Sequence, residues 1–129
     1  LEEVDVEGLR VLALRTTLEP MQSLEAEETL HLLPLFDAYT IGMPRGIEPV
    51  LTQAYKSRVF RQQGWITAVI LINGSIQGIW QHTTQRLQTV VKVQLFTSPT
   101  GAIRKGIEAE VERLAGFFKK NVLVEYEDL

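Results

Sequence analysis

The sequence contains no cysteine and only two histidines among its 129 residues. The absence of cysteine excludes disulfide bonds, thiolate metal sites and cysteine nucleophiles, and it suits a reducing compartment. No apolar run reaches the roughly 20 residues of a membrane helix, and the acidic first residues are the reverse of a basic signal peptide. We therefore expect a cytoplasmic protein without a membrane partner.

Recognisable catalytic motifs are also missing. None of the four serines lies in a Gly-x-Ser-x-Gly frame, and the glycines are scattered across turns rather than clustered before a helix. His31 and His82 have no carboxylate at a metal-ligand spacing, so we expect no metal and no cofactor. A structural, hydrogen-bonded role is expected for His31 and a solvated turn for His82. Glu108 and Glu112 are expected on a solvated helical face.

Charge is distributed unevenly along the chain, although the net charge is only −3. Residues 1–30 carry eight acidic residues and two arginines, a net charge of −6. Residues 38–106 carry eight basic residues against a single glutamate, a net charge of +7. The overall charge argues against a generic basic nucleic-acid binder, whereas the basic centre favours local contacts with an anion such as DNA.

Breaks in the hydrophobic pattern divide the first half of the chain into short elements. Alternation on both sides of residues 7–8 predicts a β-hairpin, and the acidic stretch 20–28, which opens on a proline, predicts one or two helical turns. A strand is expected at residues 29–36. Residues 37–64 contain several prolines and glycines and predict a loop-rich region with one short helix at 53–60. Loops of this length in a compact domain are usually functional or held against a partner.

The second half of the chain has sharper patterns. A β-branched run at residues 65–72 and a return strand at 75–80 flank Asn73-Gly74, the preferred pair for a type I′ turn, and predict a β-hairpin. Residues 86–96 alternate again between apolar and polar side chains. This alternation predicts a further strand with one face in the core.

A long amphipathic helix is expected near the C-terminus. Ser98-Pro99 supplies an N-cap and a first-turn proline, and five apolar residues follow at spacings of four, four, three and four. This pattern predicts a helix of about 18–20 residues. Asn121 suits the C-terminal end of the helix, and residues 122–126 predict a last strand.

Together these elements predict an α+β fold. We expect a curved antiparallel sheet, open or closed into a small β-barrel, with one long C-terminal helix packed against it. Residues 1–129 suit a single domain, because a chain of this length can bury a core of its own. The first residue is Leu rather than Met, so we expect the chain to be part of a larger protein.

Three side chains stand out as candidates for a special role. Asp37 is an acid in an apolar context, and we expect its carboxylate to cap the following backbone N–H groups, with a functional role as the alternative. Trp65 and Trp80 flank the predicted hairpin. We expect both indoles to pack in the core or at a barrel end rather than to stack on bases.

Four motifs occur in order along the chain: LLPLFDAYTIG at residues 32–42, GW at 64–65, VILING at 69–74 and GIW at 78–80. In this order they resemble the C-terminal region of the winged helix DNA-binding domain-containing proteins, over roughly residues 1–126. The residues that match the family motif are Asp37, Tyr39, Gly42, Gly64, Gly74, Gly78 and Trp80.

The resemblance implies a role in DNA repair, because that family includes bacterial DNA glycosylases that unhook interstrand crosslinks and other bulky alkylated bases. In those enzymes the winged helices supply a catalytic Gln-x-Gln or Gln-x-Asp motif, and the C-terminal part helps to form the DNA channel. None of the nine glutamines in this chain has Gln or Asp two positions later. We therefore expect the chain alone to be non-catalytic, whereas a full-length parent could be a DNA glycosylase.

Two interpretations stay open. In the first, the chain is an accessory nucleic-acid-binding module, and basic side chains contact the phosphates of double-stranded DNA. The candidate residues are Arg45, Lys56, Arg58, Arg61 and Arg86. In the second, it is a structural or protein-interaction module that packs against the winged-helix domains of the same parent chain. Gln81 stands where the family has a basic residue, and this loss of charge favours the second interpretation.

Overall fold

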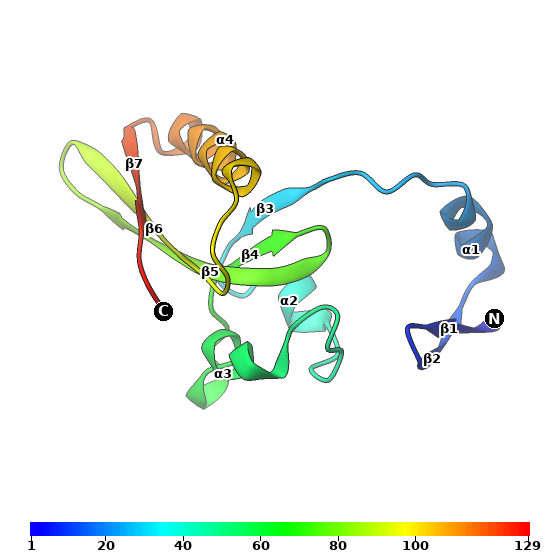
Figure 1. The fold of residues 1–129 in the computed structure, drawn as a ribbon. Helices are drawn as coiled ribbons and strands as arrows, with labels where there is room; N and C mark the ends of the chain where they lie inside the picture. The colour runs from blue at the N-terminus through cyan, green and yellow to red at the C-terminus, as the bar shows by residue number, and fades with distance from the viewer.

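The computed structural model describes residues 1–129 and contains a two-stranded and a five-stranded sheet (Figure 1). In chain order the elements are β1 (Glu2–Val6), β2 (Leu9–Ala13), α1 (Arg15–Gln22), β3 (Leu30–Leu33), α2 (Ala38–Gly42), η1 (Gln53–Tyr55), α3 (Lys56–Val59), η2 (Gln62–Gly64), β4 (Val69–Ile72), β5 (Ser75–Thr84), β6 (Gln88–Leu95), α4 (Gly101–Phe118) and β7 (Asn121–Tyr126). The mixed α+β class and the long C-terminal helix are as predicted. None of the helices combines the length and hydrophobicity needed to span a lipid bilayer.

The five-stranded sheet has the order β3-β4-β5-β6-β7 and is open, with β3 and β7 at its edges. Of the two predicted forms, an open curved sheet and a closed small barrel, the open sheet is the one observed. The pairs from β3 to β6 are antiparallel, whereas β6 and β7 are parallel. The prediction of an antiparallel sheet fails at this last pair because α4 carries the chain back across the sheet before β7 begins, as a parallel connection requires.

One face of the sheet is covered by α4 (Figure 1). Ile107 and Val111 of α4 are buried against Ile70, Val91 and Val93 of the sheet. The helix begins at Gly101, two positions later than Ser98-Pro99 suggests, because Thr100 is the N-cap and its side chain accepts a hydrogen bond from the Ile103 N–H group at 3.3 Å. It ends at Lys119, which adopts the left-handed conformation with φ 54°, and not at Asn121. The predicted caps are therefore wrong, while the predicted apolar stripe and length are confirmed.

A second core cluster lies where the loop-rich region meets the sheet. Its buried members are Leu51, Val59, Val69, Ile76 and Phe96. Ile76 joins this cluster because the β4–β5 register skips Gln77: Leu71 pairs with Ile76, whereas Ile70 pairs with Gly78. Such a bulge reverses which side chains of a strand face each side. β5 therefore serves the second cluster at Ile76 and the α4 cluster at Trp80.

Residues 1–29 form an N-terminal arm that lies apart from the five-stranded sheet and joins it through an extended segment (Figure 1). Its β1–β2 hairpin turns at Glu7 and Gly8, both at positive φ, as the alternation predicts. The predicted helical turns are misplaced, because α1 begins at Arg15 and Pro20 lies near its end. No residue of the arm is buried, so the arm has no core of its own.

Candidate nucleic-acid interface

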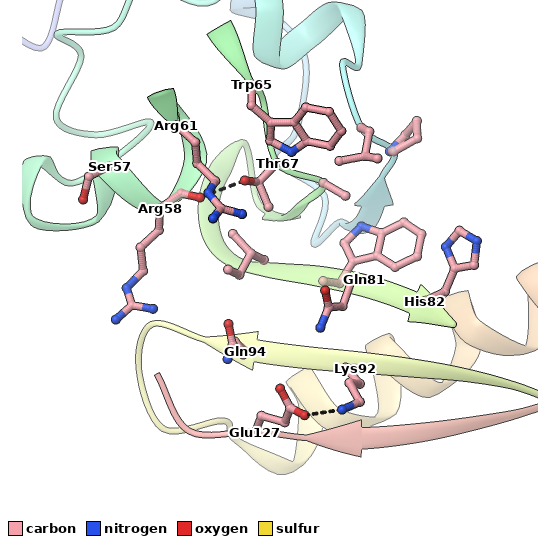
Figure 2. Close-up of a pocket in the computed structure, with 15 residues that line it drawn as sticks. Ser57, Arg58, Arg61, Trp65, Thr67, Gln81, His82, Lys92, Gln94 and Glu127 are labelled. Atoms are coloured by element: carbon pink, nitrogen blue, oxygen red, sulfur yellow. Dashed lines mark hydrogen bonds and ion pairs between the residues drawn. The ribbon is translucent and has the colours of Figure 1, made fainter. Parts of the chain in front are cut away.

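A cleft of about 820 Å³ lies between the five-stranded sheet and the loop-rich region. Val91 and Val93 belong to the α4 cluster, so the alternation of β6 directs Lys92 and Gln94 to the opposite face. These two side chains and Gln81 of β5 form the floor of the cleft (Figure 2). The wall comes from the loop-rich region, so the cleft joins segments that are far apart in the sequence.

The wall of the cleft carries Arg58 and Arg61, both exposed (Figure 2). Arg58 lies in α3, and its carbonyl oxygen accepts a hydrogen bond from the Thr67 hydroxyl at 2.9 Å. The Arg61 N–H donates to the Trp65 carbonyl at 2.8 Å and closes a tight turn. Gly64 has φ +74° in this turn, a conformation that favours glycine. The hydrogen bonds to Thr67 and Trp65 thus fix the backbone of Arg58 and Arg61, from which the two guanidinium groups project.

Lys92 on the floor of the cleft is paired with Glu127, which follows β7. The Lys92 Nζ and Glu127 Oε1 atoms lie 2.8 Å apart. Hydrogen bonding and then Coulombic attraction to the Glu127 carboxylate raise the pKa of Lys92, so the ammonium stays charged. Arg58 and Arg61 make no ion pair, and Glu127 is the only carboxylate in the lining. The cleft therefore offers two uncompensated positive charges to a ligand.

The two tryptophans have different environments. Trp80 is buried, and its Nε1–H donates to the Leu33 carbonyl at 2.8 Å, so the prediction that it packs in the core is confirmed. Trp65 is 47 % exposed and lines the cleft, so the same prediction for Trp65 is wrong. Its ring meets Phe36 edge-on at a centroid distance of 5.3 Å. Trp65 follows the turn that ends at Gly64, and this turn holds the indole at the wall of the cleft.

The other predicted phosphate contacts do not line the cleft. The Arg45 guanidinium lies over the Phe60 ring, 4.5 Å from its centroid, and Lys56 is half-buried at the start of α3. Arg86 lies in the turn between β5 and β6, at the far end of that long hairpin (Figure 1). Of the five candidates, the structure brings only Arg58 and Arg61 together. Lys92 was missed, although its place on the polar face of an alternating strand was a usable signal.

The family-motif residues tie the β3–α2 segment to the β4–β5 hairpin. The Asp37 carboxylate accepts a hydrogen bond from the Tyr39 N–H at 2.9 Å, which confirms the predicted cap. The Tyr39 hydroxyl donates to the Gly74 carbonyl at 2.9 Å, and Gly74 has φ +81° in the hairpin turn. A Cβ atom at Gly78 would lie 2.7 Å from the Gln94 carbonyl oxygen, so only glycine fits there.

Gly42, another residue that matches the family motif, is the last residue of α2. A side chain at this position would project into open space. Of the seven residues that match the family motif, only Trp80 borders the cleft. In this structure their contacts are those of residues that shape the fold.

Neither histidine has the predicted environment. His31 is exposed on β3 and its ring makes no hydrogen bond, because the side chain points away from the buried cluster that contains Leu32. His82 lies within β5 rather than in a turn, and its ring centroid is 5.0 Å from that of Phe118 on α4. No three His, Asp or Glu side chains come together in a way that could hold a metal ion.

Comparison with known proteins identifies the family of the chain. Residues 1–117 match the family described as "DNA glycosylase AlkZ-like". An "Interstrand DNA cross-link repair glycosylase" from Streptomyces sahachiroi is 32% identical over 116 residues, which are 90% of this chain and 31% of that protein. The solved structure of the Streptomyces sahachiroi DNA glycosylase AlkZ superposes with a TM-score of 0.84 at 28% identity, covering 98% of this chain and 33% of that one.

The chain thus spans about a third of the length of the curated relative that it matches. The shared fold extends over nearly all of the chain, and the family match includes the cleft wall and most of its floor. These matches confirm that the chain is related to DNA-repair glycosylases, as the sequence motifs indicated. The chain belongs to the AlkZ-like DNA glycosylase family.

Proposed function

We propose that the chain is an accessory nucleic-acid-binding module of a winged-helix, DNA-repair glycosylase-like protein and is not catalytic by itself. The observation that carries this proposal is the convergence of Arg58 and Arg61 on one cleft without any compensating ion pair. Guanidinium groups in such a position recognise phosphates, which dominate the affinity of proteins for DNA. The relative named for the repair of interstrand DNA crosslinks supports DNA as the ligand.

The chemistry of the cleft supports a binding role. Its one carboxylate, Glu127, is held by Lys92 at 2.8 Å, and the chain lacks the Gln-x-Gln and Gln-x-Asp motifs. A general base needs free access to the proton that it removes, which this ion pair opposes. We expect no base release above background when the pure chain is incubated with alkylated or crosslinked DNA.

A titration of duplex DNA at low ionic strength tests the proposal. Contacts from Arg58 and Arg61 predict weak, sequence-independent binding, with a dissociation constant of about 10⁻⁴ M or weaker and a log–log salt slope of roughly −2. The double variant Arg58→Ala/Arg61→Ala should reduce the slope by about one unit per lost contact. Lys105→Ala, an exposed position on α4, is the matched control and should leave the slope unchanged.

Two outcomes would contradict DNA binding by this surface: no saturable signal at low salt, or equal binding by the double variant and the parent. Either would favour the second candidate function, a structural module that packs against winged-helix domains of the same parent chain. A specific observation supports that alternative. The N-terminal arm exposes apolar side chains that no part of the described chain covers, among them Leu12 and Leu24.

A further inference from the structure

The shape of the cleft differs from what a duplex backbone alone would need. Phosphates on the outside of a double helix can be met by cations on an open surface, whereas Arg58 and Arg61 line a concavity of about 820 Å³. Cavities of this size lie in the range that encloses small organic ligands. The concavity is therefore large enough to admit a nucleotide unit that projects from its strand.

An aromatic surface stands beside these cations. Trp65 lines the same cleft and is 47 % exposed, which is unusual for a side chain whose burial would stabilise the fold. Phe36 contacts the indole edge-on, at an interplanar angle of 73°, and supports the ring from the side. A supported indole next to guanidinium groups is the arrangement that proteins use to stack the bases of a single strand.

The floor adds neutral hydrogen-bonding groups. Gln81 and Gln94 line the cleft from neighbouring strands, and Gln81 is the register partner of Lys92. The Gln94 amide donates one hydrogen bond, to the Asp128 carbonyl at 3.2 Å, while the Gln81 amide has no partner in the protein. An amide carries both donors and an acceptor and can pair with the edge of any base that is not already paired.

From these three observations we infer that the cleft binds unpaired nucleotides of single-stranded DNA. A base stacks on Trp65, its flanking phosphates contact Arg58 and Arg61, and the floor amides meet the base edge. This inference rests on the proposed DNA-binding function and narrows it to a class of substrate. It also explains why the cleft combines charge with an exposed aromatic ring, which phosphate contacts alone do not require.

Binding of labelled oligonucleotides to the full chain, followed by anisotropy, tests the inference together with tryptophan fluorescence. A thymidine oligonucleotide should bind at least about tenfold more tightly than a blunt duplex with the same number of phosphates. It should also quench the tryptophan fluorescence, mainly that of Trp65, which is 47 % exposed whereas Trp80 is 7 % exposed. Trp65→Leu should remove the preference, weakening single-strand binding by roughly tenfold with little change in the salt slope.

Matched variants separate stacking from folding. Trp65→Phe retains an aromatic face, so it should keep most of the single-strand affinity although the quenching disappears. Lys105→Ala should behave as the parent, because it lies on α4. Equal binding of single strand and duplex, with unchanged Trp65 fluorescence, would overturn the inference and leave the proposed DNA-binding function standing. The absence of binding to either oligonucleotide at low salt would overturn both.

Discussion

The two faces of the five-stranded sheet are built in different ways. The α4 face is closed by one helix of 18 residues that packs on a cluster of eight buried apolar residues. On the other face, helical segments of three to five residues pack against the sheet and share with it a cluster of five buried residues. They leave the polar floor of the cleft uncovered. A regular helix presents a continuous apolar stripe, whereas short segments cannot.

This difference separates stability from binding. The α4 face combines fully buried side chains from distant parts of the sequence, so most of the hydrophobic stabilisation of the sheet is concentrated there. The cleft face displays the unpaired Arg58 and Arg61 and the exposed Trp65, which gain little from folding. Changes on the first face should therefore alter the free energy of unfolding, and changes on the second should alter ligand affinity.

The largest expected effect belongs to Ile107→Ala on the α4 face. Ile107 is fully buried in the cluster beneath α4, so its truncation should leave a cavity and reduce the free energy of unfolding by about 2–5 kcal/mol. Urea denaturation measures the loss. DNA affinity per folded molecule should not change.

Glu112→Ala, at an exposed position of the same helix, serves as the control for Ile107→Ala and should shift the midpoint only slightly. The division between the faces would be contradicted if Ile107→Ala weakened DNA binding by the folded protein as strongly as Arg58→Ala/Arg61→Ala. It would also be contradicted if the arginine variant lost as much stability as Ile107→Ala.

The sequence predicts the local elements of the fold far better than it predicts the cleft. The apolar spacing along α4, the Asn73-Gly74 turn and the Asp37 cap are local patterns, and the structure contains all three. The cleft depends on relations that local patterns do not contain. The skipped Gln77 reverses the sides of β5, and the parallel pairing of β7 brings Glu127 beside Lys92.

The turn that ends at Gly64 illustrates the same limit for the candidate site. Charge counting identified the basic centre of the chain but could not distinguish Arg58 and Arg61 from Arg45, because all three are exposed arginines in a loop-rich region. What distinguishes them is the backbone bond from Arg61 to Trp65, which directs the wall toward the sheet. Predicting that bond requires knowledge of where the strands lie.

Asp37→Ala, at the edge of the cleft face, should change the free energy of unfolding by an intermediate amount. The variant removes the acceptor that caps α2 at 2.9 Å and should lower the free energy of unfolding by about 1 kcal/mol. Asp37→Asn retains an acceptor oxygen and should keep most of the stability. An unchanged urea midpoint for Asp37→Ala would show that the cap contributes nothing.

The smallest change in the free energy of unfolding is expected for two buried threonines, one on each face of the sheet. Thr40 in α2 and Thr89 in β6 are both fully buried, but only the Thr89 hydroxyl has a partner, the Thr84 hydroxyl at 3.3 Å. A buried hydroxyl without a partner destabilises a fold, so Thr40→Val should leave the free energy of unfolding unchanged or raise it by up to about 1 kcal/mol. Thr89→Val should lower it by about 0.5–1.5 kcal/mol, because it breaks the hydrogen bond of the buried Thr89 hydroxyl. Urea denaturation midpoints of the two variants, compared at constant m-value, measure both changes. If Thr40→Val lost as much stability as Thr89→Val, the Thr40 hydroxyl would have to be hydrogen-bonded in solution, and the missing partner would not explain any difference between the two threonines.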